Sequence, residues 1–465
     1  PPDFVVWPET TRQVADVVDV AREHGAPVVP YGGGSGVCGG AMSGGGGIVL
    51  DLKRLERLVS VSVEDGLATA ECGIIGQTLE DRLNLRGLTL GHFPASIYCS
   101  TLGGWLAARS AGQMSSKYGK IEDMVHAVEA VLGDGQIVEC SAVEEPNLVP
   151  LLVGSEGTLG IITRATMRVH DLRQHRVFRG FEFPRISSGC EAMRRVMQRG
   201  LRPAVLRLYD EMDTLMARPS GQQEAGKKRS LLGSALQLLP GMVDGGGSDL
   251  RHRLLNAALS RAGMLIRAVE ALAPRLSGGC LAVMGLEGDP GLVEAEAALC
   301  NAEFEAAGGR DLGEGPGLAW YERRYDVSYK MSPVYASGGF VDTMEVATTW
   351  DRLMDLYGAV RTALGPLAMV LAHFSHAYPE GCSIYFTFAA SAEGRVKSDN
   401  LYDEIWRRGL AAVIKAGGTI SHHHGVGQAK AAFMQEEHGP AMATYRKLKS
   451  VMDPGGILNP GKMGL

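Results

Sequence analysis

The stretch Pro30-Tyr31-Gly32-Gly33-Gly34-Ser35-Gly36-Val37-Cys38-Gly39-Gly40 decides the fold. Because glycine dominates it, its backbone amides can turn together toward an anionic group such as a phosphate. The β-like run 26–29 precedes this glycine loop and another, 48–52, follows it, which argues against a floppy surface segment. We therefore predict that the glycine loop, residues 30–40, is the seat of a phosphate-bearing cofactor.

The loop also contains the pattern of a dinucleotide-binding motif. Gly34-Ser35-Gly36-Val37-Cys38-Gly39 fits G-x-G-x-x-G, but that motif requires a helix directly after the glycines. Residues 39–47 are almost all glycine and small side chains, which do not begin a stable helix. The sequence therefore argues against a Rossmann fold, and its mixture of short strands and helices favours the α+β class.

Composition limits the class of protein further. The chain has 465 residues and a formal net charge of −6, which predicts more than one domain and argues against nucleic acid as the main partner. Its eight cysteines form no C-x-x-C pair, so we expect reduced thiols, mostly in the core. No apolar run has the length of a membrane span and no signal peptide is visible, so we expect a cytoplasmic protein.

Three further stretches rich in glycine and small residues follow the glycine loop. They are residues 91–105, 115–123 and 154–163. Any one of them alone is compatible with a structural turn. Four such stretches in order along the first third of the chain indicate that they build one cofactor site.

These four stretches together resemble the FAD-binding domain of the vanillyl-alcohol oxidase superfamily, the PCMH type. The resemblance implies FAD as the cofactor, with its pyrophosphate on a glycine loop that has no Rossmann helix. It implies an α+β fold in which a two-subdomain FAD-binding domain (1–171) precedes an α+β cap or substrate domain with an antiparallel sheet (172–395). A C-terminal segment (396–465) is expected to complete the active site and the flavin contacts.

The motif match also implies which residues contact FAD. They are Pro30, Tyr31, Gly32, Gly33, Gly34, Ser35, Gly36, Ala95, Ser96, Thr101, Gly103, Gly104, Ala108, Ser110, Ala111, Glu156, Gly157, Gly160, Ile161 and Ile162. Family members with a histidyl flavin carry a histidine in the glycine loop, where Ser35 and Gly36 stand here, so that linkage is absent. Cys99 has the spacing of a thioether-linked branch, but we favour a small buried thiol and a non-covalent FAD.

The middle of the chain offers two candidate sites. Arg207 lies in a half-buried strand pattern, and a salt bridge with Asp210 on an exposed edge is its structural alternative. Residues 217–255 are expected to be an insert. Within it, residues 227–240 join positive charges to a short leucine-rich segment, which suggests either peripheral membrane contact or a loop that tucks into the cap.

Reactive side chains concentrate in two C-terminal stretches, residues 372–388 and 421–428. The metal-assisted 2-hydroxy-acid dehydrogenases of the superfamily use three histidines and a glutamate there. His373 and His424 match two of those ligands, but Tyr385 and His423 replace a histidine and the glutamate. Because a histidine and a carboxylate are lost together, we expect no metal ion.

The same stretches instead resemble the alkyldihydroxyacetonephosphate synthase (alkylglycerone-phosphate synthase) family, with its G-x-x-Y-F and S-H-H-H-G-V-G motifs. The resemblance implies that Tyr385 is the general acid/base and that His422, His423 and His424 form the polar wall of the site. Arg207 falls on an arginine important in that family. We expect neighbouring positive or polar groups to lower the pKa of Tyr385 from about 10.

The implied reaction exchanges an acyl group for a long-chain alkoxy group through a covalent adduct at flavin N5, in ether-lipid synthesis. One departure puts the phosphate-bearing substrate in doubt: Met331 stands where the family has a phosphate-gripping arginine. Lys330 replaces the charge but not the bidentate geometry. We expect Lys330 and His373 to contact a small or lipid-like substrate, and we expect a homodimer.

Two alternatives remain open. An FAD-dependent oxidase or dehydrogenase of a hydroxy acid or alcohol would use the same tyrosine and histidines to accept a hydroxyl proton. A non-enzymatic flavin-binding protein is the second alternative, and it leaves Tyr385 and the row of histidines unexplained.

Overall fold

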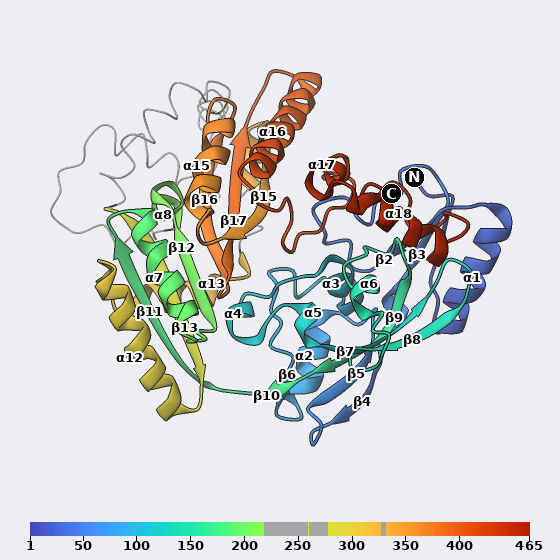
Figure 1. The fold of residues 1–465 in the computed structure, drawn as a ribbon, viewed down its shortest axis with the longest axis horizontal. Helices are drawn as coiled ribbons and strands as arrows, with labels where there is room; N and C mark the ends of the chain where they lie inside the picture. The colour runs from blue at the N-terminus through green and yellow to red at the C-terminus, as the bar shows by residue number, and fades with distance from the viewer. Residues whose placement is uncertain (218–258, 260–277, 327–331) are drawn as a thin grey trace. The chain divides into compact units, whose positions relative to one another are not determined.

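The chain folds into two compact units, seen in the computed structural model that describes residues 1–217, 259, 278–326 and 332–465. The first unit contains residues 1–173 and 420–465, and the second contains residues 174–419 (Figure 1). The second boundary therefore lies at 419 rather than at the expected 395. The reason is that helix α16 (Arg395–Lys415) packs on the second unit's sheet, where Trp406 meets Phe388 edge to face.

The first unit is built on two main sheets. A parallel sheet has the order β1-β3-β2, and an antiparallel sheet has the order β4-β5-β9-β7-β8. Its strands are β1 (Phe4–Val6), β2 (Val28–Tyr31), β3 (Ile48–Asp51), β4 (Leu58–Ser62), β5 (Leu67–Glu71), β7 (Val125–Val131), β8 (Ile137–Ser141) and β9 (Ile161–Arg168), with β6 (Leu88–Thr89) paired to β10 (His170–Asp171). Its helices include α1 (Thr11–His24), α2 (Gly76–Asn84), α3 (Leu102–Ala108), α17 (Met434–His438) and α18 (Ala441–Met452).

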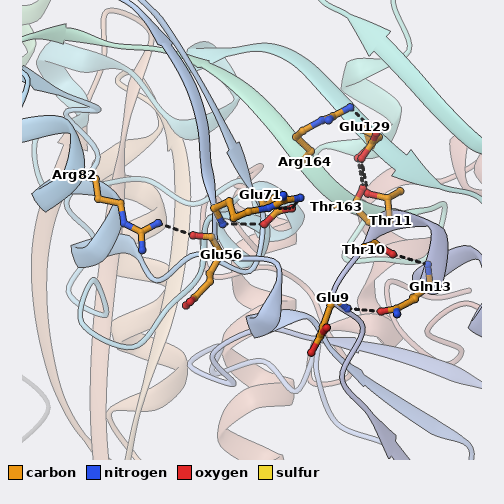
Figure 2. A network of polar contacts seen from close by, with 11 residues as sticks. Glu9, Thr10, Thr11, Gln13, Glu56, Glu71, Arg82, Glu129, Thr163 and Arg164 are labelled. Atoms are coloured by element: carbon orange, nitrogen blue, oxygen red, sulfur yellow. Dashed lines mark hydrogen bonds and ion pairs between the residues drawn. The ribbon is translucent and has the colours of Figure 1, made fainter.

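Helix α1 has a residue suited to capping at each of its ends. The Thr10 hydroxyl accepts a hydrogen bond from the Gln13 amide at 3.2 Å, and Gly25 ends the helix with a φ of 62°. Figure 2 shows how the start of the helix is tied to the antiparallel sheet: Glu129 on β7 accepts hydrogen bonds from the Thr11 and Thr163 hydroxyls. The buried face of α1 then completes one apolar core with β2, β3 and the C-terminal segment.

The glycine loop leaves β2 and reaches β3 through turns, with no helix between them. The exclusion of a Rossmann fold is therefore confirmed. Helix α3 begins within the second glycine-rich stretch, and Thr101 caps it by accepting a hydrogen bond from the Gly104 amide.

The second unit is an antiparallel sheet of seven strands covered by helices. The strand order is β14-β11-β13-β12-β16-β17-β15. The strands are β11 (His175–Phe183), β12 (Val205–Tyr209), β13 (Cys280–Gly288), β14 (Arg310–Asp311), β15 (Phe340–Thr349), β16 (Met369–Ala377) and β17 (Gly381–Ala390). The helices include α7 (Ile186–Gln198), α8 (Glu211–Ala217), α12 (Pro290–Ala306), α13 (Gly315–Arg323), α14 (Ser332–Ala336) and α15 (Leu353–Leu364).

The two faces of this sheet differ in character. On one face Leu208, Phe374 and Ile384 lie side by side on paired strands, and the helices α7, α12, α15 and α16 cover this apolar face. Because neighbouring residues of a strand point to opposite faces, the adjacent positions Tyr209 and Tyr385 lie on the other face. That second face, called the polar face below, carries the candidate catalytic residues of the second unit.

Several expectations fall outside the described residues. Lys330, Met331 and the segment 227–240 lie there, as does nearly all of the expected insert 217–255. Among the helices that the structure does describe, none combines the length and the apolar character needed to cross a bilayer.

Candidate active site

The glycine loop packs directly against the segment 99–101. A Cβ atom added to Gly33 would lie 1.9 Å from the Cys99 carbonyl oxygen, and one added to Gly32 would lie 2.3 Å from the Thr101 hydroxyl. Both contacts are too close for any side chain, so glycine is required at both positions. The structure therefore brings together the first two stretches that the sequence analysis assigned to the cofactor.

Other positions of the loop remain open. Gly36 is exposed and a Cβ added to it would meet nothing within 4 Å, although its backbone has no left-handed φ. Gly34 is also exposed. An exposed backbone free of side chains, held on a rigid support, suits close approach of a pyrophosphate. The residues present thus fit the phosphate-bearing group that the sequence predicts.

The remaining cofactor candidates divide by exposure. Ala95 and Gly104 are exposed, and Pro30, Tyr31, Ser35, Ser96, Gly103, Ala108 and Ser110 are half-buried. The buried ones are Thr101, Ala111, Gly157, Gly160, Ile161 and Ile162. Of these, Gly157 packs against the Pro30 ring, and a Cβ added to Gly157 would lie 2.4 Å from Pro30 Cγ. This glycine therefore allows close packing at the start of the glycine loop.

Cys99 is exposed, whereas the other seven cysteines are buried. The expectation of a small buried thiol at this position was therefore wrong. The reason lies in the turn 96–100, in which the Cys99 amide bonds to the Ser96 carbonyl and Ile97 takes the buried position instead. The expectation that the cysteines are mostly core thiols is confirmed for the other seven.

Glu156 has a different environment from the other cofactor candidates. Its carboxylate accepts hydrogen bonds from the amides of Val426 at 2.5 Å and Gly427 at 2.7 Å. Its own carbonyl accepts one from the Asn459 side chain at 2.7 Å. Burial raises the pKa of Glu156, while these amide bonds and nearby lysines act in the opposite direction. Glu156 therefore anchors the C-terminal segment to the FAD-binding unit.

That C-terminal segment carries the three consecutive histidines. They lie on a bend, which the Ser421 hydroxyl closes by donating to the Gly425 carbonyl, and not on a strand. The rings of His422 and His423 meet edge to face at 83°, and those of His423 and His424 at 76°. The bend thus brings the three rings into one connected cluster in the first unit.

Sequence reasoning missed His92, which belongs to the same unit. Its ring is completely buried beside Trp105, and its Nε2 lies 3.2 Å from the Ser110 hydroxyl. Burial, together with the proximity of His423, lowers the pKa of His92 to about 3, so its imidazole is neutral. The single histidine in a glycine-flanked stretch was the only sequence signal for it.

In the second unit, four side chains form one row across the polar face. Tyr385 on β17 lies between Glu345 on β15 and His373 on β16, and His373 in turn lies opposite Tyr209 on β12. The rings of His373 and Tyr385 are stacked, with centroids 4.8 Å apart and an angle of 14° between planes. The sequence motifs predict Tyr385 and His373 in the site but not Glu345 or Tyr209, because strand pairing cannot be read from spacing alone.

The electrostatics of Tyr385 differ from the expectation. Burial and the neighbouring carboxylate of Glu345 raise the pKa of the phenol, and Arg207 acts in the lowering direction. The predicted lowered pKa was therefore wrong for this environment, because desolvation and a negative neighbour outweigh the nearby guanidinium. The phenol is protonated and is suited to donate a proton.

Arg207 lies on β12, an interior strand of the sheet, and not on an exposed edge. Its guanidinium sits over the rings of Tyr209 and Trp320, at 5.8 and 5.7 Å. The alternative of a pair with Asp210 was wrong, because Asp210 is buried on the other side of the sheet and pairs with Arg361 at 2.6 Å. Arg207 therefore presents a positive charge on the polar face.

The fold and the glycine loop define a flavoprotein, and comparison with known families agrees. Residues 2–141 match the family model for an FAD binding domain, and residues 172–463 match that for the C-terminal domain of FAD linked oxidases. The chain belongs to this family of FAD-linked oxidases, and its cofactor is FAD. The predicted superfamily and cofactor are thereby confirmed.

Individual relatives narrow the resemblance. The chain is 28% identical to an alkyldihydroxyacetonephosphate synthase of Trypanosoma brucei brucei, over 100% of this chain and 73% of that protein. It is also 28% identical to an uncharacterized FAD-linked oxidoreductase, YgcU, of Escherichia coli O157:H7, over 99% of this chain and 88% of the relative. A solved alkyldihydroxyacetonephosphate synthase superposes with a TM-score of 0.73 at 27% identity, covering 98% of this chain and 76% of that one. The α+β class with a PCMH-type FAD-binding domain is confirmed, and the roles of single residues remain predictions.

Proposed function

We propose that this FAD enzyme exchanges the acyl group of an acyl-dihydroxyacetone phosphate for a long-chain alkoxy group. The observation that carries the proposal is the row Glu345–Tyr385–His373 on the polar face, with the guanidinium of Arg207 on the same face. A protonated phenol beside a fixed cation suits a reaction that moves one proton on a phosphorylated substrate. The similarity to alkyldihydroxyacetonephosphate synthases supports the same reaction.

The atoms of this exchange balance without an electron acceptor. The bond between C1 of the substrate and the acyl oxygen breaks, and the acyl group leaves as a carboxylate. The alcohol oxygen bonds to C1, and the proton that it loses is released with the carboxylate as the fatty acid. FAD, when bound, supplies the reactive N5 atom. The protein's part is then proton transfer by Tyr385 and charge neutralisation by Arg207.

The test is to incubate the purified holoenzyme anaerobically with palmitoyl-dihydroxyacetone phosphate and hexadecanol. The proposal expects an ether product and an equal amount of free palmitate by mass spectrometry, with no electron acceptor added. Hydrolysis to palmitate without ether formation, or no turnover at all, would contradict it.

A second candidate is an FAD-dependent oxidase or dehydrogenase of a hydroxy acid or alcohol. The similarity to an FAD-linked oxidoreductase favours it, as does Met331 at the position of the synthase arginine. Here a base on the polar face accepts the hydroxyl proton while a hydride leaves the substrate carbon. Anaerobic mixing with candidate hydroxy acids and alcohols distinguishes the two, because only this candidate bleaches the flavin absorbance near 450 nm, by about the amount expected for full two-electron reduction.

A further inference from the structure

Tyr385 occupies an environment that opposes its proposed role. To move a proton in both directions, a phenol must reach its ionised form during turnover. Burial of the ring and the carboxylate of Glu345 both act against ionisation, whereas Arg207 favours it. A second positive charge close to the ring would restore the balance.

His373 is placed to carry that charge. It is the direct cross-strand partner of Tyr385, and the two rings lie almost parallel with centroids 4.8 Å apart. An opposite charge at ~4–6 Å shifts a pKa by ~1–3 units. A protonated imidazole here therefore favours the ionised phenol, whereas a neutral one contributes little.

Asp213 supplies the reason for His373 to hold a proton. Its Oδ2 lies 3.0 Å from His373 Nδ1, and both side chains are largely buried, at 18% and 14% exposure. Asp213 stands on α8, whose first turn is fixed because the Asp213 amide donates to the buried carboxylate of Asp210 at 2.8 Å. The carboxylate is thus held at the imidazole by the fold.

We propose that Asp213 is a positioning residue that keeps His373 protonated and oriented as the cation stacked on Tyr385. This inference rests on the proposed use of Tyr385 for proton transfer. The geometry assigns the three residues a sequence of charges: negative on Asp213, positive on His373, and a phenol that ionises beside it.

Other charged and titratable groups face the same rings. Arg207 and Tyr209 on β12 lie toward His373, with the rings of Tyr209 and His373 5.7 Å apart. Glu345 on β15 lies beside Tyr385, and the ring of His376 lies 6.4 Å from it. Asp213 differs from these groups in that its carboxylate lies 3.0 Å from a nitrogen of the His373 ring, so the test removes this carboxylate.

The test is the titration of His373 in the holoprotein labelled with ¹³C at histidine Cε1, with His373→Gln used to assign the resonance. In the wild type we expect His373 to titrate above its reference value of about 6.5. In Asp213→Asn the midpoint should fall by ~1–3 pH units. Asp213→Glu, which keeps the charge, should restore at least part of the shift, and Asp355→Asn, an exposed carboxylate of the same unit, should leave the midpoint unchanged.

An equal midpoint in the wild type and Asp213→Asn would overturn the proposal, as would a wild-type His373 that is already neutral below about pH 6. If Asp213→Asn does not fold, the wild-type midpoint and Asp213→Glu still decide. No substrate enters this titration, so its failure is separate from a failure of the exchange reaction. With an active substrate, the basic limb of the turnover profile should move to lower pH in Asp213→Asn, whereas a merely structural role would lower turnover equally at every pH.

Discussion

The carboxylate of Glu156 binds the amide of Val426 at 2.5 Å and so joins two segments that lie 270 residues apart in the chain. The family resemblance carries Glu156 over as a cofactor contact, yet both of its carboxylate oxygens are occupied by backbone amides of the C-terminal segment. His422, His423 and His424 lie two to four residues before Val426, so Glu156 holds the chain close to the histidine cluster.

We expect Glu156→Gln to loosen the histidine segment. Its amide group can accept only one of the two backbone hydrogen bonds, and leaving a buried amide unpaired costs about 1–3 kcal/mol. Hydrogen exchange measured by mass spectrometry on the holoprotein should show faster exchange at residues 420–430. Glu144→Gln, at an exposed position of the same unit, is the control. Unchanged exchange in Glu156→Gln would mean that the two amides find other partners.

The fold was largely predictable because its signals are local. The Thr10 cap, the Gly25 stop and the helix-free glycine loop each depend on residues close together in sequence, and the structure has all three. The site was less predictable. Glu345 and Asp213 join Tyr385 and His373 through strand pairing and helix placement, which spacing does not encode.

The direction of the pKa shift of Tyr385 was predicted wrongly for a similar reason. The sequence shows the positive and polar side chains near the C-terminal motifs, but it shows neither the depth of the phenol nor Glu345 beside it. Desolvation depends on the complete packing around a group, so its sign can be recognised only in the folded chain.

We expect Tyr385→Phe to reduce turnover by about 10²–10⁴-fold, the usual contribution of a positioned proton-transfer group. FAD should remain bound, since Tyr385 belongs to the second unit and the glycine loop to the first. The flavin absorbance per protein and the rate of ether formation measure the two effects separately. Loss of FAD in this variant would show a structural role for the phenol instead.

Gly33→Ala and Gly36→Ala should distinguish glycines that the protein needs for packing of the loop from glycines that it needs for binding FAD. At Gly33 the new methyl group meets the Cys99 carbonyl, so the loop must shift and overpacking should cost about 1–3 kcal/mol of unfolding free energy. At Gly36 the methyl group meets no protein atom within 4 Å, so we expect the apoprotein to keep its stability while FAD affinity falls. Urea unfolding of the apoproteins and flavin titration test both. Equal stability of the two variants would contradict the packing argument.

Glu80 on α2 should make the stability of the protein depend on pH. It is almost completely buried, and burial raises the pKa of its carboxyl to about 7, against the hydrogen bonds from Thr89 and the Leu90 amide. Because the folded state holds the proton more tightly than the unfolded chain, this stabilisation is fully present below about pH 4.5 and is lost as the pH rises through about 7.

Glu80→Gln keeps the shape of the side chain and removes this titration. The unfolding free energy of the wild type minus that of Glu80→Gln should therefore fall between about pH 5 and pH 8, by roughly 3 kcal/mol at most. Urea unfolding at a series of pH values measures the difference, and the same comparison with Glu64→Gln, at an exposed position, should give no slope. A difference that stays constant or rises with pH would contradict this prediction. It would mean that Glu80 is ionised in the folded protein because its hydrogen bonds with Thr89, Leu90 and Gly91 outweigh its burial.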